Sequence, residues 1–575
     1  MRIFASDRLK WRLLIIAAIL WGCLLRFYAL GEKVYWEDET FTSLRLSGHS
    51  EEELIETAFQ GDVVYPADLL QFQIISVNTG LGDTVSSLVN DTHPPGYFVL
   101  LRLWVDWFGR SITSLRSLSA VVSLLLLPGI FGLAWMLFEA SPQRRAIAEL
   151  STALVAVSPY QIALANEARM YSLLPVVTTV AGLCLLWAVR AASSRRAWQR
   201  WGGYALASVA SLYVHWLAVP ILAGYGLYTK LQHRVSHSLH WARAQQQYLL
   251  TTALTIGAIA PWVLFVGKQI NNVYYQTKWT GDAVGFWGHE ESLGQLWLQH
   301  GLLLFFDGDI FSQFLWLKWI GGGCAIAFIL GVLLYLIRHT TLPVWSFLLI
   351  SSGIIYTPLA IADILLGGRR SGVFRYLSPS LGAIEISVAF CLVSLSGVAL
   401  LKMQSQRADQ PIAQPITQSI TQPIEPIAQP ITQAITQPIT QAIEPIAQPL
   451  LQQAARWTIV LLLIGGALSQ TIAKATYSVE QHPIGHLASV VNQTPNALLL
   501  SDAPRPSLLL PLAHLLKAET PLKLTVRPDW PTLEDIGDRP VFLYLTSEEF
   551  QTSLKEQGKN LRPVAGIEHL LSIER

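Results

Sequence analysis

Charged residues and cysteines are scarce in this sequence, and each scarcity excludes a class of protein. Asp, Glu, Lys and Arg make up 14% of the 575 residues, far below the level of a soluble protein. The four cysteines, Cys23, Cys184, Cys324 and Cys391, all lie within apolar segments, which argues against a disulfide framework and a thiolate metal site. No basic cluster with interleaved aromatics suggests nucleic acid as a partner. The expected partner is the membrane.

Long apolar segments predict a polytopic membrane protein. Two of them, 115–137 and 376–401, carry a single charge each, Arg116 and Glu385. The uncharged stretch 201–229 is long for one span and is interrupted at His215, so we expect two helices that meet there. The prediction is about eleven spans. The segments without charge are 13–25, 150–166, 170–189, 201–229, 244–267, 319–337, 339–362 and 457–473.

The distribution of Lys and Arg predicts the orientation. The N-terminal segment and three later loops are basic, and all four fall on one side if the spans alternate. The segment 31–90 is acid-rich instead. We therefore expect a multi-pass protein of the plasma membrane, with a cytoplasmic N-terminus and a long external loop over 31–113. The amphipathic stretch 94–108 is expected to lie on the outer membrane surface. The first apolar segment lacks a small-residue cleavage site, so we expect it to be retained.

Composition divides the chain into four parts. We expect a transmembrane core over 1–402, a cytoplasmic linker over 403–455, a last transmembrane helix over 456–475 and an external domain over 476–575. The linker repeats PIAQ, PITQ and SITQ units, whose prolines forbid a continuous helix. The predicted fold is an all-α polytopic membrane protein with a small extracytoplasmic C-terminal α/β domain.

The external domain combines strand and helix patterns. Three short apolar runs, 497–501, 522–526 and 541–545, are typical of strands. We expect helices over 507–516, kinked or restarted by Pro511, and over 547–556, opened by the capping pair Thr546 and Glu549.

Polar clusters gather at the outer ends of the predicted spans. A carboxylate there can act as a general base, and arginines can hold a phosphate leaving group. The combination suits transfer from a lipid phosphate. The clusters are Glu37-Asp38-Glu39, the segment 90–97 with His93 and Tyr97, the turn 166–171 with Glu167, Arg169 and Tyr171, the break at His215, and Arg369-Arg370 followed by Arg375 and Tyr376.

Each cluster also has a structural interpretation. The acidic triplet is compatible with a solvated loop, Glu167 and Arg169 with an ion pair that caps two helices, and His215 with a hydrogen-bonded core histidine. Arg375 at the start of a span is also placed to extend toward the interface. Glu385 lies inside a span, where an acid is a functional candidate. It can instead serve only to neutralise Arg26, so it is left out of the site.

Five motifs in order resemble one family. They are the Leu25-Arg26-Phe27-Tyr28 exit of the first span followed by the D-E pair, H-P-P-x-Y at 93–97, S-P at 158–159, E-A-R-M-Y-S at 167–172 and R-Y-L-x-P at 375–379. Together they resemble the polyprenyl-phosphate-dependent glycosyltransferases of the GT-C fold, in particular the protein mannosyltransferase and aminoarabinose transferase group (glycosyltransferase family 39-like). The resemblance covers residues 11–400.

The resemblance implies an enzyme that moves a sugar from a polyprenyl-phosphate donor to an external acceptor by inverting displacement. It implies Asp38 as the catalytic base with Glu39 in support, although the triplet leaves Glu37-Asp38 as an alternative register. No cofactor is certain, but His93 and His215 are candidates for a divalent metal. The acceptor is a protein, a lipid or a polysaccharide. The implied substrate-binding residues are His93, Tyr97, Glu167, Arg169, Tyr171, His215, Arg375 and Tyr376.

The alternative function is a transporter or flippase for a lipid-linked glycan. Its polar residues would be expected near the bilayer midplane and along broken helices. Here the polar clusters lie at outer span ends, which favours the enzyme.

Overall fold

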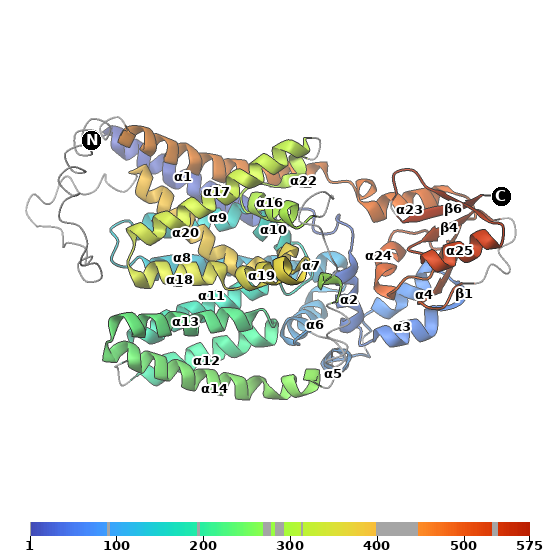
Figure 1. The fold of residues 1–575 in the computed structure, drawn as a ribbon, viewed down its shortest axis with the longest axis horizontal. Coiled ribbons are helices and arrows are strands. Elements are labelled where there is room, and N and C mark those ends of the chain that lie inside the picture. Colours follow the sequence, from blue (N-terminus) through green and yellow to red (C-terminus); the bar gives the residue numbers. More distant parts are fainter. Residues whose placement is uncertain are drawn as a thin grey trace, which may run out of the picture.

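The computed structural model has a long helical bundle that ends in a smaller domain with a β-sheet (Figure 1). It describes residues 2–574 apart from 77, 89–92, 193–195, 268–277, 282–291, 312–313, 398–446, 532–538 and 568. The predicted linker over 403–455 therefore lies outside the described residues as far as 446, as do residues 90–92 of the second polar cluster.

Six helices of the described chain are long and apolar enough to cross a membrane, and two bent pairs raise the number to eight. The spans are Ile112–Leu137 (α7, Ile112–Leu124, and α8, Leu126–Leu137), Leu173–Arg190 (α11), Leu239–Phe265 (in α14, Leu239–Gly267), Leu315–His339 (α17), Phe374–Ser396 (η5, Phe374–Leu377, and α20, Ser378–Ser396) and Ala447–Thr476 (ending in α22, Gly466–Thr476). The bent pairs are Arg144–Val157 with Pro159–Ala165 (α9 and α10) and Leu342–Gly353 with Tyr356–Leu366 (α18 and α19).

Three more helices belong to the same bundle (Figure 1). They are α1 (Arg2–Leu25), α12 (Ala197–Val214) and α13 (Ala218–Ser236). The sequence-based number of about eleven spans includes these three. The expected break at His215 is confirmed, since His215 has extended backbone between α12 and α13. Pro220 lies in the first turn of α13, where its missing N–H costs no hydrogen bond.

The Ser158-Pro159 motif bends a span by 57° between α9 and α10. Pro159 has no N–H to offer the carbonyl of Val155. Arg26, fully buried beyond the end of α1, donates instead to the carbonyls of Val155 (3.0 Å) and Ala156 (2.5 Å). Arg26 therefore supplies the hydrogen bond that the carbonyl of Val155 cannot receive from Pro159.

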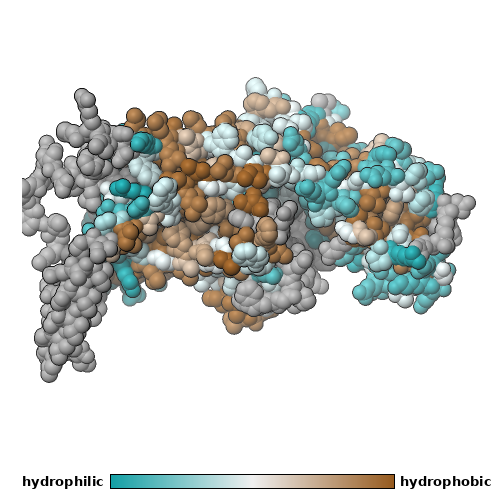
Figure 2. Space-filling view, turned by 90° about the horizontal axis from the view of Figure 1, so that it is seen from above, coloured by the Kyte–Doolittle hydropathy of each residue, from teal (hydrophilic) through white to brown (hydrophobic). Residues whose placement is uncertain are grey.

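The surface of the bundle is apolar. Figure 2 shows hydrophobic residues over the bundle and hydrophilic residues gathered on the domain at the other end. Large apolar side chains are exposed on several helices, including Leu254, Leu264, Leu334, Ile364 and Leu365. An exposed apolar surface of this extent fits a lipid environment. The chain is a multi-pass membrane protein.

The last span is longer than expected. It begins at Ala447, inside the region assigned to the linker, instead of near residue 456. Pro449 falls in the first turn, where proline is tolerated, and no proline follows before Thr476. The helix therefore starts at the end of the proline repeats.

The C-terminal domain has a six-stranded mixed sheet in the order β1-β3-β2-β4-β6-β5. The central strands β3, β2 and β4 are parallel, and the outer strands are antiparallel to their neighbours. Three strands were predicted, and β1, β5 and β6 were missed. The strands are β1 (Gln60–Val64), β2 (Leu498–Ser501), β3 (Leu522–Thr525), β4 (Val541–Tyr544), β5 (Asn560–Pro563) and β6 (Leu570–Glu574).

The first external loop and the C-terminal domain share one hydrophobic core. Strand β1 comes from that loop and pairs with β3, and Leu54 and Leu69 of the loop pack in one cluster with Leu499 and Leu510. The loop contains α2 (Glu37–Leu46), α3 (Glu51–Ala58), α4 (Pro66–Leu70), α5 (Leu81–Ser87) and α6 (Gly96–Phe108). The domain adds α23 (Pro483–Gln493), η9 (Pro506–Leu508), α24 (Leu510–Ala513) and α25 (Glu548–Glu556).

One prediction for the helices of this domain needs correction. The cap of α25 is Ser547, whose hydroxyl accepts the N–H of Phe550 (3.2 Å), and not Thr546, because α25 begins one residue later than that cap requires. The segment expected to be helical over 507–516 contains two short pieces, η9 and α24, because Pro511 restarts the helix in its first turn, one of the two effects predicted for this proline. The helix α23 was not predicted.

Candidate active site

The acidic triplet forms the first turn of α2. Trp36 precedes it with extended backbone, and acids at this position interact favourably with the helix dipole. Successive residues of a helix point about 100° apart. The side chains of Glu37, Asp38 and Glu39 therefore leave α2 in three directions, and each meets a different part of the protein.

Glu39 points into the bundle and has no exposed surface. Its carboxylate forms a bidentate ion pair with Arg116 of α7, at 2.8 and 2.6 Å, and accepts the N–H of Ala168 at 2.8 Å. Arg116 also donates to the carbonyls of Leu30 and Val34. Glu39 thus ties α2 to α7 and to the turn after α10, and it supports the site without reaching solvent.

Asp38 points toward two arginines. Its Oδ2 lies 3.3 Å from a terminal nitrogen of Arg375 and 3.7 Å from Nε of Arg169. The Asp38 side chain is 21% exposed, and that of Arg375 is 14% exposed. The structure thus brings three predicted site residues together, with a partly exposed carboxylate between two guanidinium groups.

Arg169 links α2 to the histidines. It donates to the Asp38 carbonyl (3.1 Å) and to the Thr42 hydroxyl (3.2 Å), and its other terminal nitrogen lies 3.3 Å from Nε2 of His93. The His93 and His215 rings are 5.8 Å apart between centroids. Residues far apart in the sequence therefore meet at one end of the bundle.

Aromatic rings surround the arginines. The guanidinium of Arg375 lies over the rings of Trp36 (5.0 Å) and Tyr171 (5.7 Å). The ring of Tyr171 is 5.3 Å from that of His215 and 6.4 Å from that of Tyr376. Such cation–π contacts hold a guanidinium in place without neutralising its charge. Trp36 is one of the aromatic residues around Arg375, but it was not among the predicted site residues.

His215 is arranged as a hydrogen-bond donor. Its Nδ1 accepts the N–H of Leu217 at 3.0 Å, so a neutral ring carries its proton on Nε2. Burial, helped by the positive charges of Arg169 and Arg375 and by the neighbouring His93, lowers the pKa of His215 well below its usual value. A neutral ring with Nε2–H suits a phosphate or hydroxyl oxygen.

The predicted metal role fits these residues poorly. A ring nitrogen that carries a proton cannot ligate a metal. Among the residues that the structure describes, no three His, Cys, Asp or Glu side chains are grouped to hold a metal ion.

Tyr97 lies behind the site. Its hydroxyl is hydrogen-bonded to that of Ser119 at 2.8 Å, and Ser119 donates to the carbonyl of Arg169 at 3.2 Å. The side chain is fully buried. Tyr97 therefore supports the backbone of Arg169 through Ser119.

Glu167 lies in the turn between α10 and α11, next to the Glu39 pair. Burial raises the pKa of Glu167 to about 8, with the negative charges of Glu39 and Asp38 adding to the effect and Arg375 opposing it. Its Oε2 is buried without a hydrogen-bond partner in the described part of the chain. At neutral pH Glu167 is therefore mostly protonated. Arg169 itself forms an ion pair with Asp38.

This carboxyl predicts a pH-dependent stability. Its pKa is higher in the folded protein than in the unfolded chain, so the folded state binds the extra proton and stability falls as pH rises from about 4.5 to about 8. Glu167→Gln is expected to raise the Tm of the purified protein by a few degrees at pH 8 and to leave it unchanged at pH 4. Equal shifts at both pH values would contradict the assignment.

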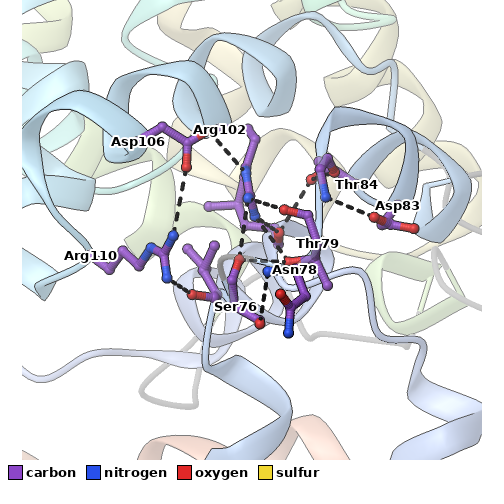
Figure 3. Close-up of polar contacts among 11 residues, drawn as sticks. Ser76, Asn78, Thr79, Asp83, Thr84, Arg102, Asp106 and Arg110 are labelled. Carbon is purple, nitrogen blue, oxygen red and sulfur yellow. Dashed lines mark hydrogen bonds and ion pairs between the residues drawn. The ribbon is translucent and has the colours of Figure 1, made fainter.

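The far end of α2 is anchored by α6 (Figure 3). Arg102, only 2% exposed, donates to the carbonyls of Leu46 at 3.0 Å and of Thr79, and forms an ion pair with Asp106 at 3.4 Å. The Thr84 hydroxyl donates to the same Leu46 carbonyl (3.2 Å). The helix that carries Asp38 is thus held at both ends.

Sequence reasoning missed Arg116 and Arg102 as parts of this framework. Arg116 had a signal, because it is the single charge of its predicted span and such a charge needs a partner. The sequence carries no such signal for Arg102, because its partners are mostly backbone carbonyls of α2 and of the loop before α5.

No protein-family model matches the sequence, and no curated protein matches it. Solved structures similar to the chain include ArnT from Cupriavidus metallidurans in the apo state, with 15% identity, a TM-score of 0.47 and coverage of 98% of this chain and 97% of that one. The same protein bound to undecaprenyl phosphate has 14% identity, a TM-score of 0.45 and coverage of 98% of both chains. The Archaeoglobus fulgidus oligosaccharyltransferase tethered with an acceptor peptide has 10% identity, a TM-score of 0.46 and coverage of 90% of this chain and 64% of that one.

Proposed function

We propose that the protein is a membrane glycosyltransferase that transfers a sugar from a polyprenyl-phosphate donor to an acceptor on the extracytoplasmic side of the plasma membrane. The observation that carries the proposal is the partly exposed carboxylate of Asp38 between Arg169 and Arg375 at the end of a membrane bundle. Arginine suits phosphate because its guanidinium is always charged and offers several donors.

The reaction is a single inverting displacement. Asp38 accepts the proton of an acceptor hydroxyl or amine as that atom bonds to the anomeric carbon. The bond from the anomeric carbon to the phosphate oxygen breaks, and its electron pair stays on the phosphate. Arg375 and Arg169 stabilise the charge that develops there.

Donor binding and base activation are coupled in this arrangement. Both arginines contact the same oxygen of Asp38, Oδ2. The donor phosphate is a diester with one negative charge, like a carboxylate, and it competes with Asp38 for these guanidiniums. When the phosphate binds, Asp38 loses its cationic partners and becomes a stronger base. Asp38 is then activated only when the donor is in place.

The surrounding rings supply donor contacts. His215 offers Nε2–H to a phosphate or sugar oxygen, with His93 beside it. Trp36, Tyr171 and Tyr376 give flat apolar surfaces of the kind that pack against a sugar or a prenyl chain.

Arg375→Ala is expected to impair donor use while the fold is retained. The loss of one charge-stabilising donor lowers kcat/KM for the polyprenyl-phosphate sugar by about 10²–10³-fold. Steady-state kinetics with varied donor check this. The matched control is Arg338→Ala, an exposed arginine in the last turn of α17. Unchanged donor kinetics in Arg375→Ala would remove this residue from the site.

A comparison of cells with and without the gene tests the function as a whole. Mass spectrometry of their glycoproteins, glycolipids and polysaccharides is expected to show one product that lacks a sugar when the gene is absent. Identical profiles under conditions in which the protein is expressed would count against the proposal.

The location of the polar groups favours the enzyme over the predicted alternative, a transporter. A transporter would carry its polar groups near the bilayer midplane. The arginines, histidines and Asp38 gather where α2 meets α7 and the turn after α10, at the end of the bundle nearest the C-terminal domain (Figure 1). The main exception to this location is Glu385, a buried acid within a span, which lies 3.5 Å from Gln161.

A further inference from the structure

The third acid of the triplet, Glu37, points away from the bundle and toward the C-terminal domain. Its Oε1 accepts a hydrogen bond from the hydroxyl of Ser507 at 2.9 Å. Ser507 lies in η9 of that domain and has no exposed surface. This contact joins residues 470 positions apart in the sequence.

Charged groups from several elements face Glu37. Burial raises the pKa of Glu37, and its neighbour Asp38 adds to the effect, whereas Arg505, the Ser507 hydroxyl and Arg375 lower it. Tyr544, at the end of β4, faces the same carboxylate. The ionised form of Glu37 therefore depends on groups that the C-terminal domain supplies.

Packing extends the contact along α2. Leu44 of α2 is fully buried in one cluster with Leu510 and Leu512 of α24. Just before α2, the ring of Tyr35 meets that of His514 at 5.2 Å, edge to face. The C-terminal domain thus covers the side of α2 that faces away from the bundle.

We propose that the C-terminal domain is part of the catalytic unit, because Ser507 holds Glu37 and so fixes the first turn of α2, with Asp38 placed between Arg169 and Arg375. Glu37 and Ser507 are positioning residues, and Asp38 is the group that meets the substrate. The inference rests on the proposed function for its catalytic part, whereas the contact itself stands on geometry. Each acid of the triplet then has its own partners, which are Ser507 for Glu37, Arg169 and Arg375 for Asp38, and Arg116 for Glu39.

The test compares Ser507→Ala with Ser501→Ala in the full-length protein. Ser501 is a matched control, because it is also fully buried in this domain and its hydroxyl has no hydrogen-bond partner among the described residues. Hydrogen exchange is measured at the amides of Glu39 and Thr40, which bond to the Trp36 carbonyl in the first turn of α2. Faster exchange is expected in Ser507→Ala only.

The kinetic test measures kcat and the KM for the donor separately, because the proposal predicts a change in kcat and not in KM. A misplaced base lowers kcat by about tenfold in Ser507→Ala, the value of one hydrogen bond to a charged group, and leaves donor KM near its original value. The acidic limb of the pH profile moves to higher pH in Ser507→Ala, because Glu37 then protonates more easily. In Glu37→Gln, which keeps the acceptor oxygen but cannot titrate, the Ser507→Ala change no longer moves this limb.

The outcomes separate the two proposals. Unchanged exchange in Ser507→Ala, or changed exchange with an unchanged kcat and pH profile in an active enzyme, overturns the positioning role. A wild-type protein that transfers no sugar overturns the proposed function, while the exchange measurement still decides whether Ser507 holds α2.

Discussion

Asp38→Asn is expected to lower the kcat for sugar transfer by about 10³-fold, within the range for loss of a general base. The substitution keeps the size of the side chain and removes its ability to take a proton. Arg169 and Arg375 lose a competing carboxylate, so donor binding is expected to be unchanged or tighter. Transfer from a labelled polyprenyl-phosphate sugar in membranes measures the effect.

The control for this variant is Asp62→Asn, an exposed acid of β1 in the same external loop. It is expected to transfer sugar at the original rate. Undiminished transfer in a correctly inserted Asp38→Asn protein would show that another group is the base, and the register Glu37-Asp38 would then be tested with Glu37→Gln.

Glu39→Ala is expected to destabilise the protein by about 3–5 kcal/mol, because it leaves the buried charge of Arg116 without its partner. Arg116→Ala is expected to have a similar effect from the other side of the pair. The double variant Glu39→Ala/Arg116→Ala should lose less than the sum of the two, since no unpaired charge remains. Thermal unfolding of the purified variants measures these differences.

The control here is Glu56→Ala, an exposed glutamate of α3, for which a change within about 0.5 kcal/mol is expected. A Glu39→Ala protein as stable as the original would contradict a structural role for the pair. Additive losses in the double variant would show that the two side chains act independently.

The membrane architecture could be predicted from the sequence because long uncharged segments have one physical explanation. The break at His215 was predicted for the same reason. The sheet was predicted only in part. β2, β3 and β4 are apolar runs, but β1 has the composition of a loop, and its pairing with β3 depends on contacts between distant parts of the chain. No local pattern encodes such a contact.

The site shows the same limit. The alternation of spans predicted that the polar clusters share one face, and the structure places Asp38, Arg169, His93, His215 and Arg375 together. Sequence order could not assign directions to three consecutive acids, because these follow from where α2 begins. It also could not place Tyr97 behind Arg169, since that position depends on how α6 packs against α7.

The most direct test of the central claim uses the purified protein in liposomes with a polyprenyl-phosphate donor labelled in the sugar and a membrane extract as the acceptor source. The account predicts that the label leaves the lipid, that polyprenyl phosphate is released in equal amount, and that Asp38→Asn does neither. Label that stays on the lipid while the lipid crosses the bilayer would contradict it.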